Sequence, residues 1–342
     1  MDYPTTQSTL HIELTDKCQA ACPMCARNVN GGIDRDFVGQ YDVSLNQFKE
    51  WFPKEWLATL TNFYACGNYG DPIIAKDCLE IFEYVRACNP TVRMAIHTNG
   101  SARSTQWWKD LAIAMGPYQE VCFGIDGFAS SHVLYRRGTQ FDKIIENAKA
   151  YISSGGYATI DSLVFEHNQY EKDEFEAAML TIGFSKVNFK ITSRFYDLTE
   201  FPVYDKTGNI EYTLKPVSLE HLKPKKIIPI KEIATNISIW TQRILPAATV
   251  KPRCVDNKEI YVDARGNVFP CCWVGSEIIE DRIKEVYDMH KLRNLLIENT
   301  KRKISHIPNL QDAPITELEL WKGIDHWFYG DDKTWTCVKN CS

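Results

Sequence analysis

Between residue 8 and about residue 195, short apolar runs alternate with longer stretches whose apolar residues recur every three or four positions. The short runs are rich in β-branched and aromatic residues and predict strands. These predicted strands are Thr9–Leu14, Asn62–Ala65, Val92–His97, Glu120–Ile125, Ala158–Val164 and Lys186–Ile191. The longer stretches predict helices, which are Ser44–Trp51, Lys76–Ala87, Thr105–Ala114, Phe141–Ser153 and Tyr170–Thr181. Six such alternations predict an α/β fold with a parallel sheet and crossover helices, either barrel-like or doubly wound.

The pattern changes after the sixth predicted strand. The segment Phe201–Pro229 contains several prolines, an Asp-Lys-Thr-Gly turn and solvated lysines, and it predicts a connector with a short hairpin near Ile210–Leu214. Farther on, Glu259–Phe269 alternates apolar and polar residues on both sides of the turn Ala-Arg-Gly-Asn, and it predicts a β-hairpin. We therefore expect three parts: residues 1–195, a connector over residues 196–250, and a smaller domain over residues 251–342.

The composition of the 342 residues is that of an ordinary globular protein, with 44% hydrophobic and 24% charged residues. The formal net charge of −5 gives no indication of a nucleic-acid or anionic-membrane partner. No apolar run is long enough to span a membrane, and the first residues lack the features of a signal peptide, so we expect a cytoplasmic protein. In a reducing compartment, clustered cysteines indicate metal rather than disulfides. Four isolated cysteines are expected to be small buried hydrophobic residues: Cys66, Cys78, Cys88 and Cys122.

A cluster of three cysteines, Cys18, Cys22 and Cys25, follows the first predicted strand. Thiolates are soft ligands that suit iron–sulfur clusters or zinc. A closed structural zinc site takes four ligands, whereas this loop offers three. Three thiolates on a four-iron cluster leave one iron open to a substrate or cofactor. The alternative is three buried or zinc-binding thiols.

The Cys-x3-Cys-x2-Cys pattern resembles the signature of the radical S-adenosylmethionine (SAM) enzymes. The resemblance implies that Cys18, Cys22 and Cys25 hold a [4Fe-4S] cluster whose open iron chelates SAM. It also implies reductive cleavage of SAM to a 5′-deoxyadenosyl radical, which abstracts a hydrogen atom from the substrate, and an electron donor such as flavodoxin or ferredoxin. The implied fold for residues 1–195 is a partial (β/α)6 barrel of the TIM type.

Short polar motifs follow several predicted strands, where ligands gather in parallel α/β folds. The segment Gly67–Pro72 is similar to the family's Gly-Gly-Glu-Pro, which implies that Gly70 and Asp71 bind the SAM amino group. Two further segments, His97–Gly100 and Gly124–Gly127, resemble the family's Thr-Asn-Gly and Ser-Ile-Asp-Gly and imply SAM contacts for their polar residues, Asn99 and Asp126. The chain departs from the family in having Asp71 for Glu and Gly124 for Ser.

Two further features imply SAM contacts. Arg136-Arg137-Gly138 resembles the family's Arg-Gly, whose arginine pairs with the SAM carboxylate, but the sequence does not distinguish Arg136 from Arg137; a solvated basic pair is the alternative. Met24 precedes the third cysteine, at the position of the adenine contact, where the family often has an aromatic residue. The segments that contain His167 and Arg194 resemble substrate-facing segments of one branch of the family. A structural His167 and a surface Arg194 are the alternatives, and they fit the sequence at least as well.

The last 90 residues contain a second group of cysteines. Cys254 and the pair Cys271-Cys272 lie at opposite ends of the predicted hairpin, so Cys254 and Cys271 are expected to meet at its open end. With Cys337 and Cys341 they can complete a four-cysteine site. The spacing Cys254–Gly266–Cys271 is similar to the first half of the SPASM motif, and the shorter twitch version with one auxiliary [4Fe-4S] cluster fits better. Cys272 can replace Cys271 as ligand, and zinc is the alternative metal.

We therefore expect a radical SAM enzyme of the oxidoreductase or epimerase type, with a partial barrel and a small α+β twitch/SPASM-like domain. No peptide-leader recognition domain is evident, which favours a small-molecule or carbohydrate substrate. A maturase of ribosomal peptides is the alternative substrate class. A non-catalytic iron–sulfur or zinc protein is the alternative from another functional class.

Overall fold

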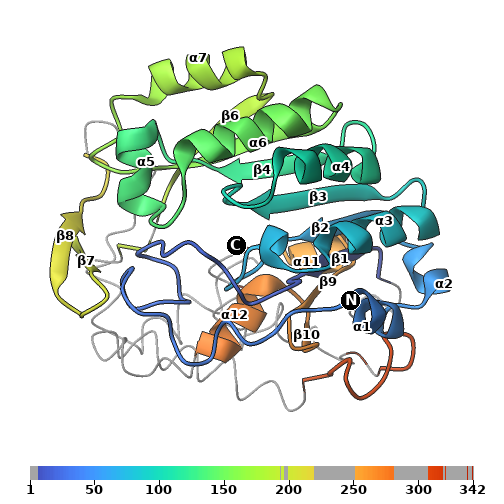
Figure 1. The fold of residues 1–342 in the computed structure, drawn as a ribbon. Coiled ribbons are helices and arrows are strands. Elements are labelled where there is room, and N and C mark those ends of the chain that lie inside the picture. Colours follow the sequence, from blue (N-terminus) through green and yellow to red (C-terminus); the bar gives the residue numbers. More distant parts are fainter. Residues whose placement is uncertain are drawn as a thin grey trace. The chain divides into compact units, whose positions relative to one another are not determined.

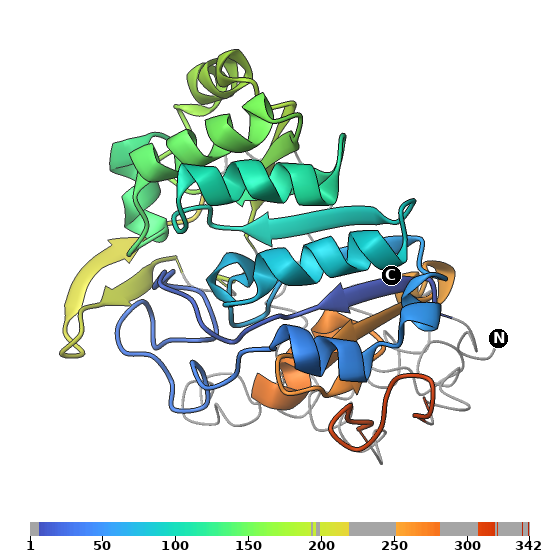
Figure 2. The same cartoon turned by 45° about the vertical axis from the view of Figure 1, so that its right-hand side comes forward.

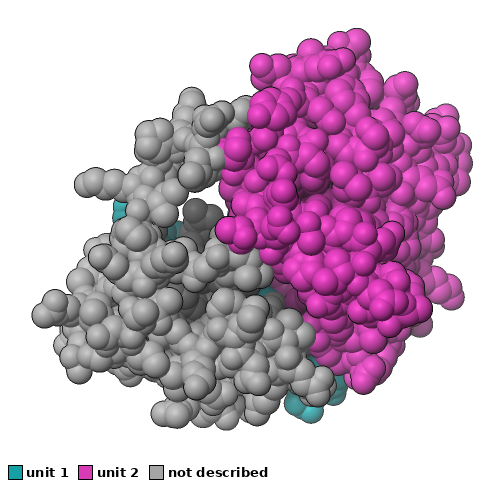
Figure 3. Space-filling view, turned by 90° about the vertical axis from the view of Figure 1, so that its left-hand side faces the viewer, with its two compact units in different colours: residues 1–12, 49–62, 226–342 teal, residues 13–48, 63–225 magenta. Residues whose placement is uncertain are grey.

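The computed structural model describes residues 7–192, 194–195, 199–218, 251–280, 307–318, 320, 337 and 341, without the side chains of residues 253 and 277–280. The chain forms two compact units (Figure 3). Unit 1 comprises Met1–Ile12, Lys49–Asn62 and Lys226–Ser342, and unit 2 comprises Glu13–Phe48 and Phe63–Lys225. The first strand is thus grouped with the C-terminal segments, which the sequence pattern did not indicate.

The sheet of unit 2 has the strand order β2-β3-β4-β5-β6 (Figure 1). Its strands are β2 (Asn62–Ala65), β3 (Arg93–Thr98), β4 (Glu120–Gly124), β5 (Tyr157–Val164) and β6 (Lys186–Ile191). The pairs β3–β4, β4–β5 and β5–β6 are all parallel. The predicted positions of these five strands are confirmed to within one residue at each end.

Helices connect these strands, as the sequence pattern predicted. They are α3 (Cys78–Cys88), α4 (Thr105–Met115), α5 (Ala129–Tyr135), α6 (Phe141–Ser153) and α7 (Lys172–Ile182). The Ser104 side chain caps α4 by accepting a hydrogen bond from Trp107 N, and Gly183 ends α7 in the left-handed conformation. Trp108, a buried residue of α4, packs against Phe123 of β4 with ring centroids 5.3 Å apart. This contact places α4 against one face of the sheet.

Some short elements of this part of the chain were not predicted. They are α2 (Lys54–Leu57), the 3-10 helix η1 (Pro72–Ile74) and α5. The predicted short hairpin is present as β7 (Phe201–Tyr204) and β8 (Ile210–Leu214), antiparallel with a bulge between Val203 and Tyr204. Tyr212 of this hairpin donates a hydrogen bond to the Leu134 carbonyl at 2.6 Å, so the hairpin packs beside α5 (Figures 1 and 2). Residues 196–198 and 219–250 of the predicted connector lie outside the described residues.

The sheet of unit 1 has the strand order β10-β9-β1. Its strands are β1 (Thr9–Ile12), β9 (Glu259–Val262) and β10 (Val268–Phe269). The strand β9 pairs in parallel with β1 and antiparallel with β10, which confirms the predicted C-terminal hairpin. All four residues of β1 are buried, and β9 pairs with β1 along one edge. Unit 1 also contains α2, the end of α1 (Leu45–Trp51), α11 (Arg253–Asp256) and α12 (Cys272–Glu280).

The turn of the C-terminal hairpin is fixed by Asp263. Its carboxylate Oδ1 accepts hydrogen bonds from Arg265 N and Asn267 N, both at 2.9 Å. Gly266 has φ +84°, and an added Cβ would lie 3.0 Å from the Trp51 ring. The glycine of the predicted turn is therefore required by both conformation and space.

The paired strands β3 to β6 of unit 2 are parallel and are connected through helices, so the expected α/β fold is confirmed. On β3 the side chains of Met94, Ile96 and Thr98 are buried, whereas those of Arg93 and His97 are more accessible. The parallel strands thus keep one face under the helices and leave a polar face opposite. Within the described ranges, no helix combines the length and apolar character needed to cross a membrane.

Candidate functional site

Three loops of unit 2 meet at Cys18. The Lys17 carbonyl accepts a hydrogen bond from Asp71 N at 2.9 Å. The Asn99 side-chain amide donates to Cys18 Sγ at 3.6 Å, and Gln19 donates to Asn99 Oδ1 at 2.7 Å. The structure therefore brings together Cys18, Asp71 and Asn99, which belong to three separate motifs of the sequence, at the carboxyl ends of neighbouring strands.

The carboxylate of Asp71 ties the loop after β2 to the end of β3. Its Oδ1 accepts a hydrogen bond from the Thr98 hydroxyl at 2.7 Å, and its Oδ2 accepts one from Asn99 N at 2.7 Å. Burial raises the pKa of Asp71, and these hydrogen bonds partly oppose that rise. Asp71 thus has a positioning role in the chain itself. Its expected contact with the SAM ammonium group stays a prediction.

Glu13 is a site residue that the sequence analysis missed. It follows β1, is 1% exposed, and accepts hydrogen bonds from Tyr69 N at 2.7 Å and Gly70 N at 2.8 Å through the same oxygen. A Cβ on Gly70 would lie 1.7 Å from the Thr15 carbonyl oxygen, so the loop passes too close for any side chain. Glu13 falls in the predicted buried strand Thr9–Leu14, and a carboxylate at such a position, which needs hydrogen-bond partners, was the signal that could have identified this contact.

Two cysteines of the first motif, Cys18 and Cys22, have a pKa that is raised by burial, and the charge of Cys25 contributes to both rises. Burial raises the pKa of Cys18 well above its usual value, and the charges of Asp71 and Cys22 add to that rise. Burial also raises the pKa of Cys22 to about 11, although the Arg136 guanidinium opposes the rise. Three thiolates this close repel one another unless a cation lies between them, and iron supplies that charge. The donor set therefore fits an iron–sulfur cluster held by Cys18, Cys22 and Cys25.

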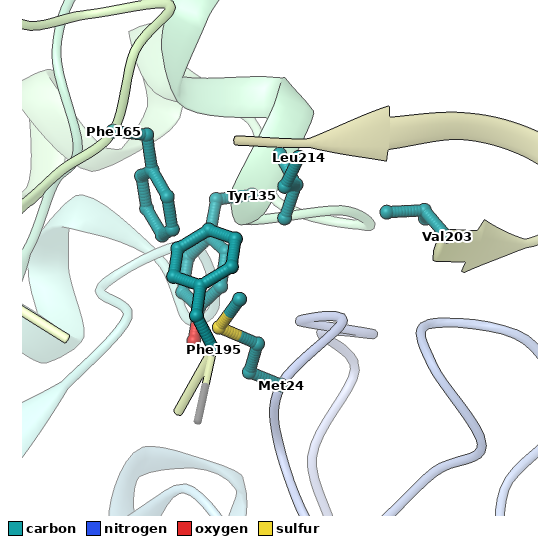
Figure 4. Close-up of a cluster of buried hydrophobic side chains, with 6 residues drawn as sticks. All are labelled: Met24, Tyr135, Phe165, Phe195, Val203 and Leu214. Atoms are coloured by element: carbon teal, nitrogen blue, oxygen red, sulfur yellow. The ribbon is translucent and has the colours of Figure 1, made fainter. Parts of the chain in front are cut away.

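The loop with the cysteines is anchored by an apolar cluster under Met24 (Figure 4). Met24 is 7% exposed and packs with aromatic and aliphatic side chains. These are Tyr135, Phe165, Phe195, Val203 and Leu214. The Met24 carbonyl also accepts a hydrogen bond from Arg194 at 2.8 Å. Arg194 thus fixes the cysteine loop, and the adenine contact of Met24 stays a prediction.

The two adjacent arginines have different environments. Arg136 donates through Nε to the fully buried Asp126 at 2.7 Å and also hydrogen-bonds to Cys22. Arg137 instead donates to the Tyr204 carbonyl at 2.6 Å and pairs with Glu211, so it holds the β7–β8 hairpin. The Arg136 guanidinium contacts a cysteine of the first motif, whereas Arg137 meets the cysteine loop through its backbone carbonyl, which accepts a hydrogen bond from Ala21 N at 2.8 Å.

Arg136 also accounts for the absence of a side chain at position 124. A Cβ on Gly124 would lie 2.7 Å from the Arg136 guanidinium. The serine that is usual in the family would therefore compete with the arginine for this space. The Oδ1 atom of Asp126 accepts a hydrogen bond from Leu163 N at 2.6 Å, and its Oδ2 atom accepts the one from Arg136. Both carboxylate oxygens of Asp126 therefore have hydrogen-bond partners.

The segment after β5 is largely structural. Asn168 donates to the carbonyls of Asp126 and Leu163 at 3.2 and 2.9 Å and accepts from Phe165 N, so it braces the loop after β4. His167 stacks on Phe165 with an interplanar angle of 8°, and burial lowers the pKa of its imidazole. The substrate-facing role considered for His167 stays a prediction.

The cysteines of the second group also come together, within unit 1. Burial raises the pKa of Cys254, and the charges of Cys337 and Cys341 raise it further. Burial likewise raises the pKa of Cys271, and the charges of Cys272 and Cys254 raise it further. Lys251 N donates to the Cys341 carbonyl at 2.7 Å, which holds Cys341 beside the segment that leads into α11 and Cys254. This thiol set fits an auxiliary cluster or zinc.

Comparison with known proteins gives matches by structure alone. No protein-family model matches the sequence, and no curated protein sequence matches it. The structure resembles that of Streptococcus suis SuiB, with a TM-score of 0.52 and 10% identity over 95% of this chain and 66% of that chain. It also resembles anSMEcpe with bound AdoMet, with a TM-score of 0.51 and 16% identity over 85% of this chain and 83% of that one.

The chain thus spans just under two thirds of the length of SuiB. SuiB has also been crystallised with S-adenosylmethionine and with its precursor peptide SuiA, in structures that each match this chain with a TM-score of 0.52. Both neighbours are radical SAM enzymes, and at these identities the likeness concerns the fold. This chain has the α/β partial-barrel fold of the radical SAM enzymes.

Proposed function

We propose that this protein is a radical SAM enzyme that abstracts a hydrogen atom from a substrate carbon. The observation that carries the proposal is the convergence of Cys18, Asp71 and Asn99 at the strand ends of unit 2. A cluster held by Cys18, Cys22 and Cys25 would supply the electron that cleaves SAM to the 5′-deoxyadenosyl radical.

The chain's own groups provide the polar contacts that this cofactor pair needs. Asp71 and the backbone of Gly70 present acceptors for an ammonium group, and Arg136 presents a cation for a carboxylate. Arg136 already pairs with Asp126, so a SAM carboxylate would share a guanidinium that is held in place. We assign Met24 to the adenine side, because it lies one residue before the third cysteine and in a buried apolar cluster.

The second thiol set supports an auxiliary cluster in unit 1. We propose that Cys254, Cys271, Cys337 and Cys341 hold it, with Cys272 as the alternative to Cys271. Such a cluster would take or relay an electron from the substrate radical, which suits an oxidation or an epimerisation of a small molecule or carbohydrate. An electron donor such as flavodoxin or ferredoxin would reduce the first cluster.

A peptide substrate is the second candidate. The observation in its favour is the structural likeness to SuiB bound to the precursor peptide SuiA. Because the identity to that chain is 12%, the likeness supports the peptide class only through the shared fold.

The test is anaerobic reconstitution followed by SAM cleavage under a strong reductant. About eight irons per chain and formation of 5′-deoxyadenosine are expected. Changing Cys18, Cys22 and Cys25 together to Ala should remove half of the iron and all cleavage, whereas the buried Cys88→Ala on α3 serves as the matched control and should leave both unchanged. Retained cleavage in the triple variant contradicts the proposal, and zinc in place of iron favours the non-catalytic alternative.

A further inference from the structure

The polar face of the sheet in unit 2 brings together one histidine, one cysteine and one aspartate. His97 lies on β3, Cys122 on β4 and Asp161 on β5, and one ligand atom from each lies within 4.8 Å of the others. His97 pairs directly with Cys122 across the parallel strands. Asp161 pairs with Gly124, two residues beyond Cys122 and therefore on the same face. Three neighbouring strands thus present imidazole, thiol and carboxylate at one place.

This face already holds a cation. The Lys190 ammonium lies 2.5 Å from Asp161 Oδ2, and His97 Nδ1 lies 4.0 Å from the same oxygen. Asn188 donates to the other carboxylate oxygen at 3.2 Å. Lys190 is 54% exposed, so its side chain can swing into solvent at small cost. The environment of Asp161 therefore favours positive charge, and the cation now there is easily displaced.

The donor set is typical of zinc. Thiolate, imidazole and carboxylate are the ligands that Zn²⁺ takes from proteins, and three of them with one open position form the usual catalytic arrangement. Bond lengths of about 2.0–2.3 Å place neighbouring ligand atoms roughly 3.2–3.8 Å apart in a tetrahedron. The 4.0 Å separation between His97 and Asp161 needs to shorten by less than about 1 Å to meet that geometry.

We propose that His97, Cys122 and Asp161 form a zinc-binding site on the polar face of the sheet, distinct from both cysteine groups. On binding, the Cys122 thiol releases its proton to solvent, and the Lys190 ammonium leaves Asp161 with its proton retained. The fourth position is then open to a water molecule or to an oxygen donor of a substrate. The three residues lie in β-strands and belong to neither cysteine group.

The experiment uses the reconstituted protein, in which iron occupies the two cysteine groups, dialysed anaerobically against Zn²⁺. Wild type should retain about one zinc per chain without loss of iron, and zinc K-edge X-ray absorption should show one sulfur with nitrogen and oxygen ligands. Cys122→Ser and Asp161→Asn should each lose this zinc, whereas Cys88→Ser, a matched change of a buried cysteine on α3, should keep it.

Lys190→Met provides the opposite change and alters only an exposed side chain. It should bind zinc more tightly, by up to about fivefold, because an exposed ion pair competes weakly. If zinc displaces iron, or if Cys122→Ser and Asp161→Asn both retain zinc, the metal is bound at the cysteine groups. Either result overturns the proposal. Absence of zinc from wild type and from Lys190→Met also overturns it and leaves an ordinary hydrogen-bonded cluster.

Discussion

Replacing Glu13 tests whether this buried carboxylate shapes the loop that carries Gly70 and Asp71. One oxygen of Glu13 accepts two backbone N–H groups, and the side chain is 1% exposed. Each hydrogen bond to a charged acceptor contributes about 1.5–3 kcal/mol, so Glu13→Ala should destabilise the loop by roughly 3–6 kcal/mol. Glu13→Gln keeps a carbonyl oxygen of the same shape and should cost only about 1–2 kcal/mol.

Amide hydrogen exchange is the appropriate assay, because it measures local opening at each residue. In Glu13→Ala, the amides of Tyr69 and Gly70 should exchange about 100-fold faster or more, while those of β4 keep their wild-type rates. If the proposed function holds, the same variant should also bind SAM more weakly, since Asp71 is the next residue. In Glu13→Gln the same amides should exchange only about 5–30-fold faster, and the loss of SAM affinity should be correspondingly smaller.

The reasoning is refuted if Glu13→Ala and Glu13→Gln exchange alike at Tyr69 and Gly70. That result would mean that the loop is held by its own backbone contacts. A general loss of protection throughout unit 2 would instead show that Glu13 supports the whole sheet rather than one loop.

Three further predictions address other parts of the chain. Gly70→Ala places a methyl group against a carbonyl oxygen and should lower the free energy of unfolding, measured by chemical denaturation, by about 3 kcal/mol or more. Gly39→Ala, with open space around the added methyl group, should lower it by about 1 kcal/mol. Equal losses of stability in the two variants contradict the packing argument. Burial lowers the pKa of His132 from 6.5 to about 3. Neutral His132 therefore contributes its full share to the free energy of unfolding above pH 6.5, and this share falls by up to about 1.4 kcal/mol per pH unit as the pH drops toward 3. The free energy of unfolding of His132→Asn should depend less on pH over this range, and an unchanged slope contradicts the prediction. Changing Cys337 and Cys341 to Ser should halve the iron content and destabilise unit 1, yet leave 5′-deoxyadenosine formation intact; full iron retention would exclude the proposed auxiliary ligands.

Asp71 needs a separate test, because it has both an observed and a proposed role. Asp71→Ala should weaken SAM binding by about 1.5–3 kcal/mol in calorimetry. Thr98→Val removes one hydrogen bond to the carboxylate but leaves the carboxylate in place. It should reduce stability without a comparable loss of SAM affinity. Equal affinity losses in the two variants would indicate that Asp71 acts only by holding the loop.

The sequence by itself determined the order of the elements in unit 2 and the fold class. Strands such as Lys186–Ile191 and helices such as Phe141–Ser153 have strong periodicity, and their bounds agree with the structure. The hairpin Glu259–Phe269 was predictable for the same reason, since its turn residues and alternation are local signals. The short elements η1 and α5 were missed because one or two turns give too little periodicity to detect.

Only the tertiary structure decided which of these local signals meet. The parallel pairing of β1 with β9 joins residues about 250 positions apart, and neither strand carries a mark of its partner. The different contacts of Arg136 and Arg137, the two hydrogen bonds to Glu13 and the approach of His97, Cys122 and Asp161 likewise depend on side chains from separate strands and loops. Periodicity and motif spacing reflect interactions within one segment of the chain. A functional site depends on the distances between segments, and these distances are determined only when the strands and loops pack together.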